Sequence, residues 1–401
     1  MRECLRVLYL TSKLPYPPTD GGRIAVWELI KRLAERGHYV TLCCFSSETN
    51  QQSVSPLEQF CHVELIHHDT HNRLIPALLN IFLPIPYTIS KYYSKRMVEA
   101  VSSLLVSYQF DLVHIEPLHM AHYLPIAKAF SLPVILREQN VESLLIERFS
   151  REARGLQRFY ARLQVPKLRR YEAKMCEQAD LCLTITEEDA RRLRSLNPRI
   201  RTVVIPAGVD TQHFYPKFGE AEEPYTIVSV ASMDWPPNVD GIMWFCNRVF
   251  TKIKEQLPQV KLYIVGKNPP LAVQKLSNGL DIVVTGFVED IRDYIARGSV
   301  FIVPLRIGSG MRLKILQAMA MGKAIVSTSV GAEGIKVNNG RDIVLADTET
   351  EFAKAVVELI VDAEKRHRIG KNARKLVECY YSWDRVIDSL EQVYYRLVRG
   401  E

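Results

Sequence analysis

Residues 303–326 read VPLRIGSGMRLKILQAMAMGKAIV, a strand pattern that runs through a glycine-rich loop into a helix and then into another strand. The loop is Gly308-Ser309-Gly310, and Arg312 and Lys314 fall in the first turn of the predicted helix. Free backbone amides and the positive end of the helix dipole favour an anion there, whereas helix starts usually carry acidic side chains. Two cations at this position therefore predict a bound anion such as a diphosphate. The alternative is a helix that merely carries surface charge.

Strand and helix patterns alternate on both sides of this stretch. Most predicted strands are followed by a helical pattern, such as the one from about Ile24 to Arg36. Strands separated by helices imply parallel sheets with helical crossovers. The predicted strands are Val7–Leu10, Tyr39–Phe45, Leu112–Ile115, Val134–Leu136, Leu181–Ile185, Val203–Ile205, Thr226–Val230, Lys261–Val265, Ile282–Thr285, Val300–Val303, Ala324–Ser327 and Ile343–Leu345.

A polar joint with prolines at 210–224 separates two series of this alternation. A chain of 401 residues also exceeds what one hydrophobic core usually spans. We therefore expect an α/β protein with two Rossmann-like, parallel-sheet domains, residues 1–215 and 216–382. The last helix, at about 383–401, is expected to cross back and pack on the first domain.

The composition excludes some functions. A net charge of +7, spread along the chain, does not predict nucleic-acid binding. The eight cysteines form no C-x-x-C pair, which argues for a reducing compartment and against disulfides or a zinc site. The first apolar run lacks a signal-peptide pattern, and the longest one is too short to span a bilayer. We expect a cytoplasmic protein, either soluble or peripheral at the inner membrane face.

For two segments, contact with an anionic membrane is an alternative interpretation. The apolar, proline-rich segment Leu74–Ile89 is expected to be buried in the first domain; the alternative is an exposed patch that suits a lipid-linked acceptor. One long helix is predicted from about Val141 to Gln178, and nine basic but only two acidic residues fall between Arg148 and Lys174. We expect it to cover the sheet with an apolar stripe; the alternative is a surface for anionic lipid or acceptor phosphates.

A second glycine-rich segment, residues 15–23, reads PYPPTDGGR and lies between the first strand and the first helix. Gly21 and Gly22 permit close backbone approach, and the helix N-terminus behind them favours an anion. The spacing is not G-x-G-x-x-G, so it does not support dinucleotide binding. A plain turn before a helix is the alternative.

Four further motifs accompany the glycine loop at set intervals along nearly the whole chain. They read VIPAGVD at 204–210, SMDWPPN at 232–238, VTGFVED at 284–290 and VGAEGI at 330–335. Together with 303–326 they resemble the retaining family-4 glycosyltransferases, which have the GT-B fold of two Rossmann-like domains facing a cleft. The segment 232–238 resembles a bacterial subgroup linked to polysaccharide biosynthesis.

The resemblance implies a nucleotide-sugar site in the second domain. The backbone of the 286–288 loop would contact the base, and the glycine loop with its two cations would hold the diphosphate and the sugar. Family members usually grip the ribose with a glutamate where this chain has Gln317. Loss of that charge is expected to weaken donor binding by about 1–2 kcal/mol. The implied donor-binding residues are Gly21, Gly22, Asn238, Gly286, Phe287, Val288, Gly308, Ser309, Gly310, Arg312, Lys314 and Gln317.

The resemblance also implies an acceptor site in the first domain with two catalytic positions. Glu116 stands where many relatives place a histidine beside the reacting sugar, and Gln139 stands where related chains often have the histidine of a His-Asn pair. His114, His119 and His122 are nearby alternatives, although a histidine near a strand end is more often structural.

The expected function is transfer of a sugar from a nucleotide sugar to a glycan or lipid-linked acceptor, with retention and without a metal or other cofactor. The chain carries no Asp-x-Asp metal motif. Because Gln139 and Gln317 depart from the family pattern, a non-catalytic GT-B protein that binds a sugar nucleotide or a partner transferase is the main alternative. A weaker alternative is a GT-B isomerase that acts on a sugar nucleotide.

Overall fold

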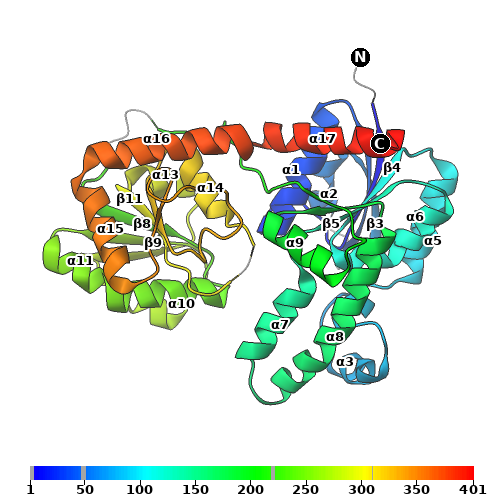
Figure 1. Cartoon of the computed structure of the whole chain (residues 1–401), viewed down its shortest axis with the longest axis horizontal. Helices are drawn as coiled ribbons and strands as arrows, with labels where there is room; N and C mark the ends of the chain where they lie inside the picture. The colour runs from blue at the N-terminus through cyan, green and yellow to red at the C-terminus, as the bar shows by residue number, and fades with distance from the viewer. Residues whose placement is uncertain (1–3, 47–50, 218–221, 309) are drawn as a thin grey trace. The chain divides into compact units, whose positions relative to one another are not determined.

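The computed structural model describes residues 4–46, 51–217, 222–308 and 310–401 (Figure 1). Ser309, part of the predicted donor loop, lies outside these residues. The chain divides into two compact units. The first contains Met1–Pro206 and Ile387–Glu401, and the second contains Ala207–Val386. Residues 207–215, which the sequence prediction assigned to the first domain, belong to the second unit.

The first unit is built on a parallel sheet that has seven strands within the described residues, in the order β3-β2-β1-β4-β5-β6-β7. Side chains of β1 and β4 are almost all buried, as expected for a parallel sheet covered on both faces. Val7 of β1 pairs with Val40 of β2 on one side and with Leu112 of β4 on the other. The strands are β1 (Arg6–Thr11), β2 (Tyr39–Ser46), β3 (His62–His67), β4 (Leu112–Glu116), β5 (Val134–Glu138), β6 (Leu181–Thr184) and β7 (Thr202–Val204).

Helices of the first unit follow its strands in turn. Asp20 caps the first of them by accepting a hydrogen bond from the amide of Arg23, so Gly21 and Gly22 belong to the helix and not to the loop before it. The helices are α1 (Gly21–Glu35), α2 (Gln51–Glu58), α3 (Leu74–Leu79), η1 (Asn80–Phe82), α4 (Tyr87–Ser90), α5 (Lys95–Ser107), η2 (Leu118–Tyr123), α6 (Leu124–Ala129), α7 (Glu142–Glu152), α8 (Gly155–Gln178) and α9 (Glu187–Leu196).

The second unit repeats this plan with a parallel sheet of six strands among the described residues, in the order β10-β9-β8-β11-β12-β13. The strands are β8 (Thr226–Val230), β9 (Lys261–Val265), β10 (Ile282–Gly286), β11 (Val300–Val303), β12 (Ile325–Ser327) and β13 (Val344–Leu345). The helices are α10 (Pro236–Trp244), the π-helical η3 (Phe245–Val249), α11 (Phe250–Gln256), α12 (Leu271–Gln274), α13 (Ile291–Arg297), α14 (Leu313–Ala320), α15 (Glu349–Val361) and α16 (Ala363–Tyr380).

In both sheets the strand order reverses beside the first strand of the unit. In the first unit β1 lies between β2 and β4, and in the second β8 lies between β9 and β11. Ligands of open α/β sheets bind outside the carboxyl ends of the strands at such a switch point. The fold therefore places two candidate sites, one at the ends of β1 and β4 and one at the ends of β8 and β11.

The last helix, α17 (Trp383–Arg399), is held on the first unit by polar contacts. Arg36 pairs with Asp388 and with Glu391 at 2.7 Å each. The ring of His38 accepts from the amide of Leu5 at Nδ1 and lies 3.0 Å from Glu391 at Nε2. Because these partners are buried or half-buried, the contacts anchor the end of the chain to the sheet.

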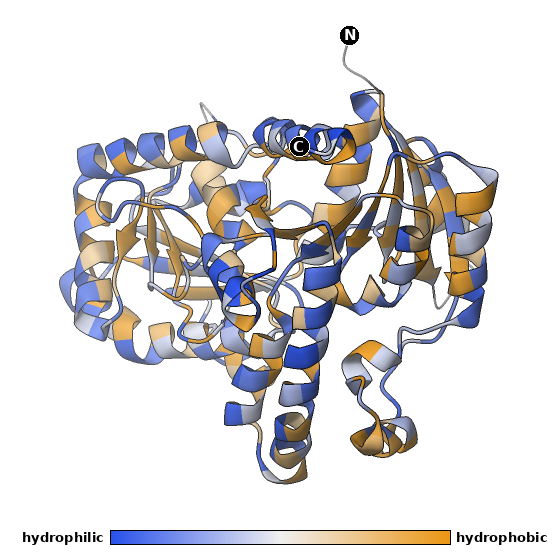
Figure 2. Cartoon of the chain, turned by 45° about the vertical axis from the view of Figure 1, so that its right-hand side comes forward, coloured by the Kyte–Doolittle hydropathy of each residue, from blue (hydrophilic) through white to orange (hydrophobic). Residues whose placement is uncertain are grey.

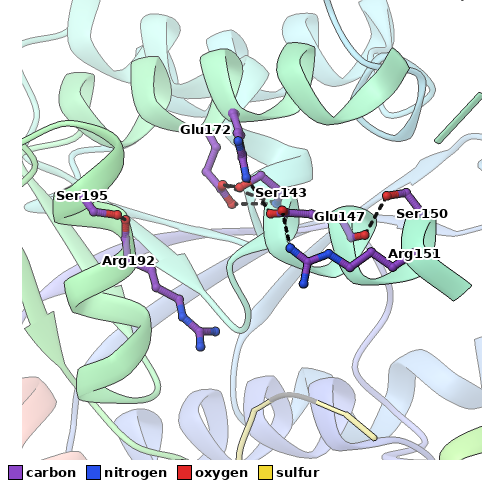
Figure 3. A network of polar contacts seen from close by, with 8 residues as sticks. Ser143, Glu147, Ser150, Arg151, Glu172, Arg192 and Ser195 are labelled. Atoms are coloured by element: carbon purple, nitrogen blue, oxygen red, sulfur yellow. Dashed lines mark hydrogen bonds and ion pairs between the residues drawn. The ribbon is translucent and has the colours of Figure 1, made fainter. Parts of the chain in front are cut away.

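The helix predicted from 141 to 178 is wrong as a single helix. The chain forms α7 and α8, which pack against each other, and the extended backbone of Ala153 and Arg154 between them interrupts a continuous helix. Glu172 of α8 is fully buried and caps α7, since it accepts a hydrogen bond from the amide of Glu142 at 2.7 Å. It also accepts one from the hydroxyl of Ser143 (Figure 3).

The expected burial of the Leu74–Ile89 segment is also wrong for most of its length. Leu74 is 84% exposed and Phe82 is 87% exposed, whereas Tyr87 and Ile89 are buried. Backbone groups of this segment contact α8: Tyr160 donates to the carbonyl of Ala77 at 3.0 Å. Figure 1 shows α3, α7 and α8 extending together beyond the first sheet.

The cysteines and the apolar helices were the subject of two further predictions. All eight cysteines are free thiols, and six of them are buried. In the part of the chain that is described, no helix has the length and apolar content to cross a membrane.

Candidate active site

The glycine loop of the second unit folds around Arg312. Gly308 and Gly310 have φ values of +145° and +81°, and a β-carbon on Gly308 would lie 2.3 Å from the Arg312 guanidinium. Arg312 donates to the carbonyl of Gly310 at 2.7 Å, and its guanidinium stacks 5.1 Å from the ring centroid of Trp235. The glycines therefore let the loop close over a buried cation.

Lys314 lies in the first turn of α14, two residues after Arg312, which is the residue that precedes the helix. Its Nζ donates to Oδ1 of Asn238 at 2.8 Å, and Asn238 is fixed in turn by donating to the carbonyl of Ser232 at 2.7 Å. Burial and the neighbouring guanidinium of Arg312 lower the pKa of Lys314 to about 7. The lysine thus contacts a neutral amide beside a second cation, an arrangement that an anionic ligand would stabilise.

The other predicted donor residues of the second unit surround this pair less closely. Gly286 ends β10 with a φ of +71°, Phe287 after it is 74% exposed, and Val288 packs partly buried on the core. Gln317 lies one turn beyond Lys314 in α14 and is partly buried. Asn238, Arg312 and Lys314 are therefore brought into one constellation, and the 286–288 loop presents an exposed aromatic ring at another strand end.

Glu116 ends β4 in the first unit and is fully buried. Tyr9 donates a short hydrogen bond to its carboxylate, and the Arg137 guanidinium lies 3.4 Å from both carboxylate oxygens. Burial, and next the charge of Glu116, raise the pKa of Tyr9 well above its usual value. The carboxylate is therefore enclosed by its own protein partners and does not line the pocket described below.

Gln139 separates Glu116 from the open space above it. Its Nε2 donates to Oε1 of Glu116 at 2.6 Å, and the residue lines a pocket of about 170 Å³ at the strand ends. A β-carbon on Gly22 would lie 2.7 Å from Oε1 of Gln139, so only glycine fits beside this side chain without a shift. The two predicted catalytic residues and Gly22 are thus neighbours in the first unit.

The pocket also contains residues that the sequence prediction did not select. Glu142, the first residue of α7, lines the pocket opposite His119 of η2, and its Oε2 lies 4.0 Å from Nε2 of His119. Burial, and next Glu172, raise the pKa of Glu142 to about 8, whereas burial and then Lys91 lower the pKa of His119 to about 4. Glu142 follows the end of β5 by four residues, a position that could have marked it.

The other two histidines that the sequence raised are structural in this fold. His114 is fully buried, stacks on Tyr9 with ring centroids 4.3 Å apart, and lies 2.6 Å from the hydroxyl of Tyr394 in α17. His122 donates to the carbonyl of Ile89 at 3.1 Å. Of the three, His119 alone lines the pocket.

Comparison with known proteins agrees with this architecture. The model of the family described as Glycosyltransferase Family 4 matches residues 19–213, and that described as Glycosyl transferases group 1 matches residues 224–362. An uncharacterized 44.6 kDa protein in the cps region of Klebsiella pneumoniae is 22% identical, over 96% of this chain and 98% of its own length. The chain is a family-4 glycosyltransferase.

Solved structures show that this glycosyltransferase has the GT-B fold. Sucrose-phosphate synthase from Thermosynechococcus elongatus superposes with a TM-score of 0.73 at 19% identity, and 99% of this chain and 100% of that chain are covered. Anabaena HepE in complex with UDP superposes with a TM-score of 0.69 at 14% identity, over 97% and 99% of the two chains. At these identities the likeness concerns the fold alone.

The site residues predicted for this glycosyltransferase fall in both units. Asn238, Gly286, Arg312, Lys314 and Gln317 lie in the second, whereas Glu116, Gln139 and both predicted glycines of α1 lie in the first. The assignment of Gly21 and Gly22 to the donor stays a prediction. No three of the described His, Cys, Asp and Glu side chains are grouped so as to hold a metal ion.

Proposed function

We propose that this glycosyltransferase moves a sugar from a nucleotide-sugar donor to a glycan or lipid-linked acceptor, with retention of anomeric configuration and without a metal ion. The observation that carries the proposal is the pair of Arg312 and Lys314 at the start of α14. Lys314 donates to a neutral amide there, and its pKa is lowered to about 7. Such a pair suits a diphosphate, and the solved Anabaena structures with UDP and with UDP-glucose support this ligand class.

The chemistry follows from where negative charge develops. As the bond between the anomeric carbon and the phosphate oxygen breaks, charge grows on the leaving diphosphate, and Arg312 and Lys314 would stabilise it. The acceptor oxygen forms the new bond from the same face of the sugar, and its proton passes to the departing phosphate oxygen. The protein then contributes electrostatic stabilisation and positioning in place of a strong general base.

Gln317 sets the expected strength of donor binding. Its amide oxygen still accepts a hydrogen bond from a ribose hydroxyl, but a neutral bond is about half as strong as a charge-assisted one. Donor affinity would therefore be lower by about 1–2 kcal/mol than with glutamate, which leaves activity intact. This departure from the family pattern needs no loss of catalysis.

We also propose that the first unit contacts an anionic membrane, as a lipid-linked acceptor requires. The proposed docking surface consists of exposed apolar residues of α3 and η1 together with exposed residues of the α7–α8 turn. Figure 2 shows the hydrophobic residues of these elements in orange. Among the described side chains, no ion pair engages its three exposed arginines. The surface consists of Leu74, Ile75, Leu78, Leu79, Phe82, Leu156 and Phe159 with Arg154, Arg158 and Arg162.

Apolar side chains next to arginines fit a membrane surface for two reasons. The apolar groups gain free energy when they enter the headgroup boundary, and each arginine near anionic lipid contributes about 1 kcal/mol. Because the chain has free, mostly buried thiols and its donors are nucleotide sugars, we place this activity at the cytoplasmic face.

Release of nucleoside diphosphate from a panel of UDP-, GDP- and dTDP-sugars tests the function. Wild type and Gln317→Glu are compared, first without an acceptor and then with a membrane lipid extract. We expect slow hydrolysis of one donor, and the glutamate variant should hydrolyse it at a lower donor concentration than wild type does. Release of nucleoside diphosphate should be faster when the extract is added. If no donor releases nucleoside diphosphate, with or without the extract, and no donor stabilises the protein thermally, the proposal is overturned in favour of a non-catalytic protein.

A further inference from the structure

The pocket of the first unit contains two titratable side chains that face each other across a gap. His119 comes from η2 after β4, and Glu142 comes from the start of α7 after β5. Their nearest atoms, Nε2 and Oε2, are 4.0 Å apart, too far for a direct hydrogen bond. Each side chain is only slightly exposed.

One hydroxyl group fits between these two atoms. An oxygen at about 2.8 Å from each of two atoms 4.0 Å apart has acceptable hydrogen-bond geometry. Near neutral pH the imidazole is unprotonated and the carboxyl group is mostly protonated, given pKa values of about 4 and about 8. The hydroxyl can then donate to Nε2 of His119 while its oxygen accepts from the carboxyl group of Glu142.

Gln139 presents a third polar atom to the same pocket, in a known orientation. The carboxylate of Glu116 can only accept, so the amide nitrogen of Gln139 must face it and the amide oxygen must face away. That oxygen is therefore able to accept a hydrogen bond from a second hydroxyl. The pocket therefore matches a ligand with several hydroxyl groups.

A cation lies at the rim of the pocket. Lys13, in the loop after β1, is exposed and lines the pocket, and no carboxylate pairs with it among the described residues. Its charge, like that of Lys91, reaches His119 and contributes to the lowered pKa of the imidazole. The remaining basic side chain of the lining, Arg23, is engaged by Asp20 at 3.7 Å. Lys13 is thus placed to bind a phosphate on the ligand.

We propose that this pocket is the acceptor subsite, that His119 and Glu142 hold one hydroxyl of the acceptor sugar between them beside its reacting hydroxyl, and that Lys13 binds a phosphate carried by the acceptor. The inference rests on the proposed function, because it names the acceptor class of that reaction: a phosphorylated sugar, free or lipid-linked. Gln139 contacts a second hydroxyl, and Glu116 is a positioning residue that acts through Gln139.

The test follows the His119 ring by NMR in protein labelled with ¹³C at histidine, and His119→Asn assigns its signal. The probes are glucose, galactose, mannose and N-acetylglucosamine, each as the free sugar and as the 1-phosphate, with inorganic phosphate alone as a further probe. We expect one sugar phosphate to shift the signal with a Kd in the millimolar range and its free sugar to bind about tenfold more weakly. Lys13→Met should abolish that difference.

Two substitutions at Glu142 separate hydrogen bonding from folding. Glu142→Gln keeps a donor and should retain binding within about threefold, whereas Glu142→Leu should weaken it by about tenfold. Glu187→Leu, at the exposed first position of α9, is the matched control. Equal binding by wild type and Glu142→Leu, or tightest binding of phosphate alone, would overturn the proposal.

The nucleotide-release assay on the same preparation separates the two proposals. If a donor is hydrolysed and no sugar or sugar phosphate shifts the His119 signal, the acceptor subsite is wrong and the transferase function stands. If no donor is hydrolysed and no sugar or sugar phosphate shifts the His119 signal, both proposals are wrong. Binding of a sugar phosphate supplied as a lipid-linked pyrophosphate in detergent, and not as the soluble 1-phosphate, would assign the lipid-linked source.

Discussion

The amide nitrogen of Gln139 donates a hydrogen bond of 2.6 Å to the buried carboxylate of Glu116. Since Arg137 and Tyr9 enclose the rest of that carboxylate, Glu116 faces protein on every described side and Gln139 faces the pocket. The sequence predicted a catalytic position for both residues, but in the structure their roles differ. Gln139 can touch a substrate, and Glu116 determines which atom of the amide does so.

Loss of the Glu116 carboxylate is expected to destabilise the fold. Glu116→Ala leaves the fully buried guanidinium of Arg137 without its counter-ion, which typically costs about 3–5 kcal/mol. Urea denaturation measures the free energy of unfolding. Glu187→Ala, which removes an exposed ion pair with Arg194 at a helix start, should change it by less than about 1 kcal/mol. Equal stability of the two variants would contradict the buried ion pair.

Removal of the Gln139 amide should affect turnover and not donor binding. Gln139→Leu is expected to lower kcat for transfer by about tenfold or more and to leave the KM for the donor unchanged, because the amide lines the first-unit pocket that we propose for the acceptor. Gly22→Ala should act in the same direction, since its β-carbon displaces the amide oxygen. Gln256→Leu, at the exposed end of α11, is the control. A raised donor KM with unchanged kcat would contradict this role.

Donor binding should depend on pH through Lys314. Its pKa is lowered to about 7 in the free protein, and a bound diphosphate raises it. Below pH 7 the lysine is protonated before and after binding, so affinity for UDP is constant. Above pH 7 binding must restore the proton, and the Kd should rise by up to about tenfold per pH unit.

Calorimetric titration with UDP between about pH 6 and pH 9 measures this dependence. Lys314→Arg stays protonated over the whole range, so it should bind UDP with an affinity that does not fall above pH 7. This variant also corrects for titration of the nucleotide itself. A wild-type Kd that stays constant above pH 7 would show that the lysine keeps its proton in the free protein.

The docking surface predicts selective loss of membrane binding. Arg154→Glu with Arg158→Glu should lower binding to phosphatidylglycerol vesicles by at least about tenfold, because each basic residue at the surface contributes about 1 kcal/mol. Leu78→Ser with Phe82→Ser should lower it through lost apolar burial. Co-sedimentation with phosphatidylglycerol and with phosphatidylcholine vesicles measures both effects.

The matched control is Arg368→Glu with Lys371→Glu on α16, which changes the net charge by the same amount on another exposed helix. We expect it to bind vesicles like wild type. If it loses as much binding as the α8 variant, net charge and not the docking surface accounts for the attraction.

Local features of the fold were predictable from sequence because they depend on neighbouring residues. The β8 strand Thr226–Val230 has the bounds that its β-branched run predicts, and the glycines of the 308–310 loop and the cations after them mark a strand–loop–helix turn. β3 was missed, since its histidines and glutamate dilute the apolar pattern. The single helix from 141 to 178 was wrong because the apolar periodicity continues through Ala153 and Arg154, where the backbone is extended.

The sequence by itself determined two α/β units, a GT-B resemblance and a cationic helix start, because strand period, glycine conformation and helix polarity act over a few residues. Only the tertiary structure decided that Glu116 lies beneath Gln139, that His119 and Glu142 face one pocket, and that Leu74 and Phe82 are exposed. These relationships join residues far apart in the chain. Their energies depend on which other groups exclude water from them, and no local pattern records that.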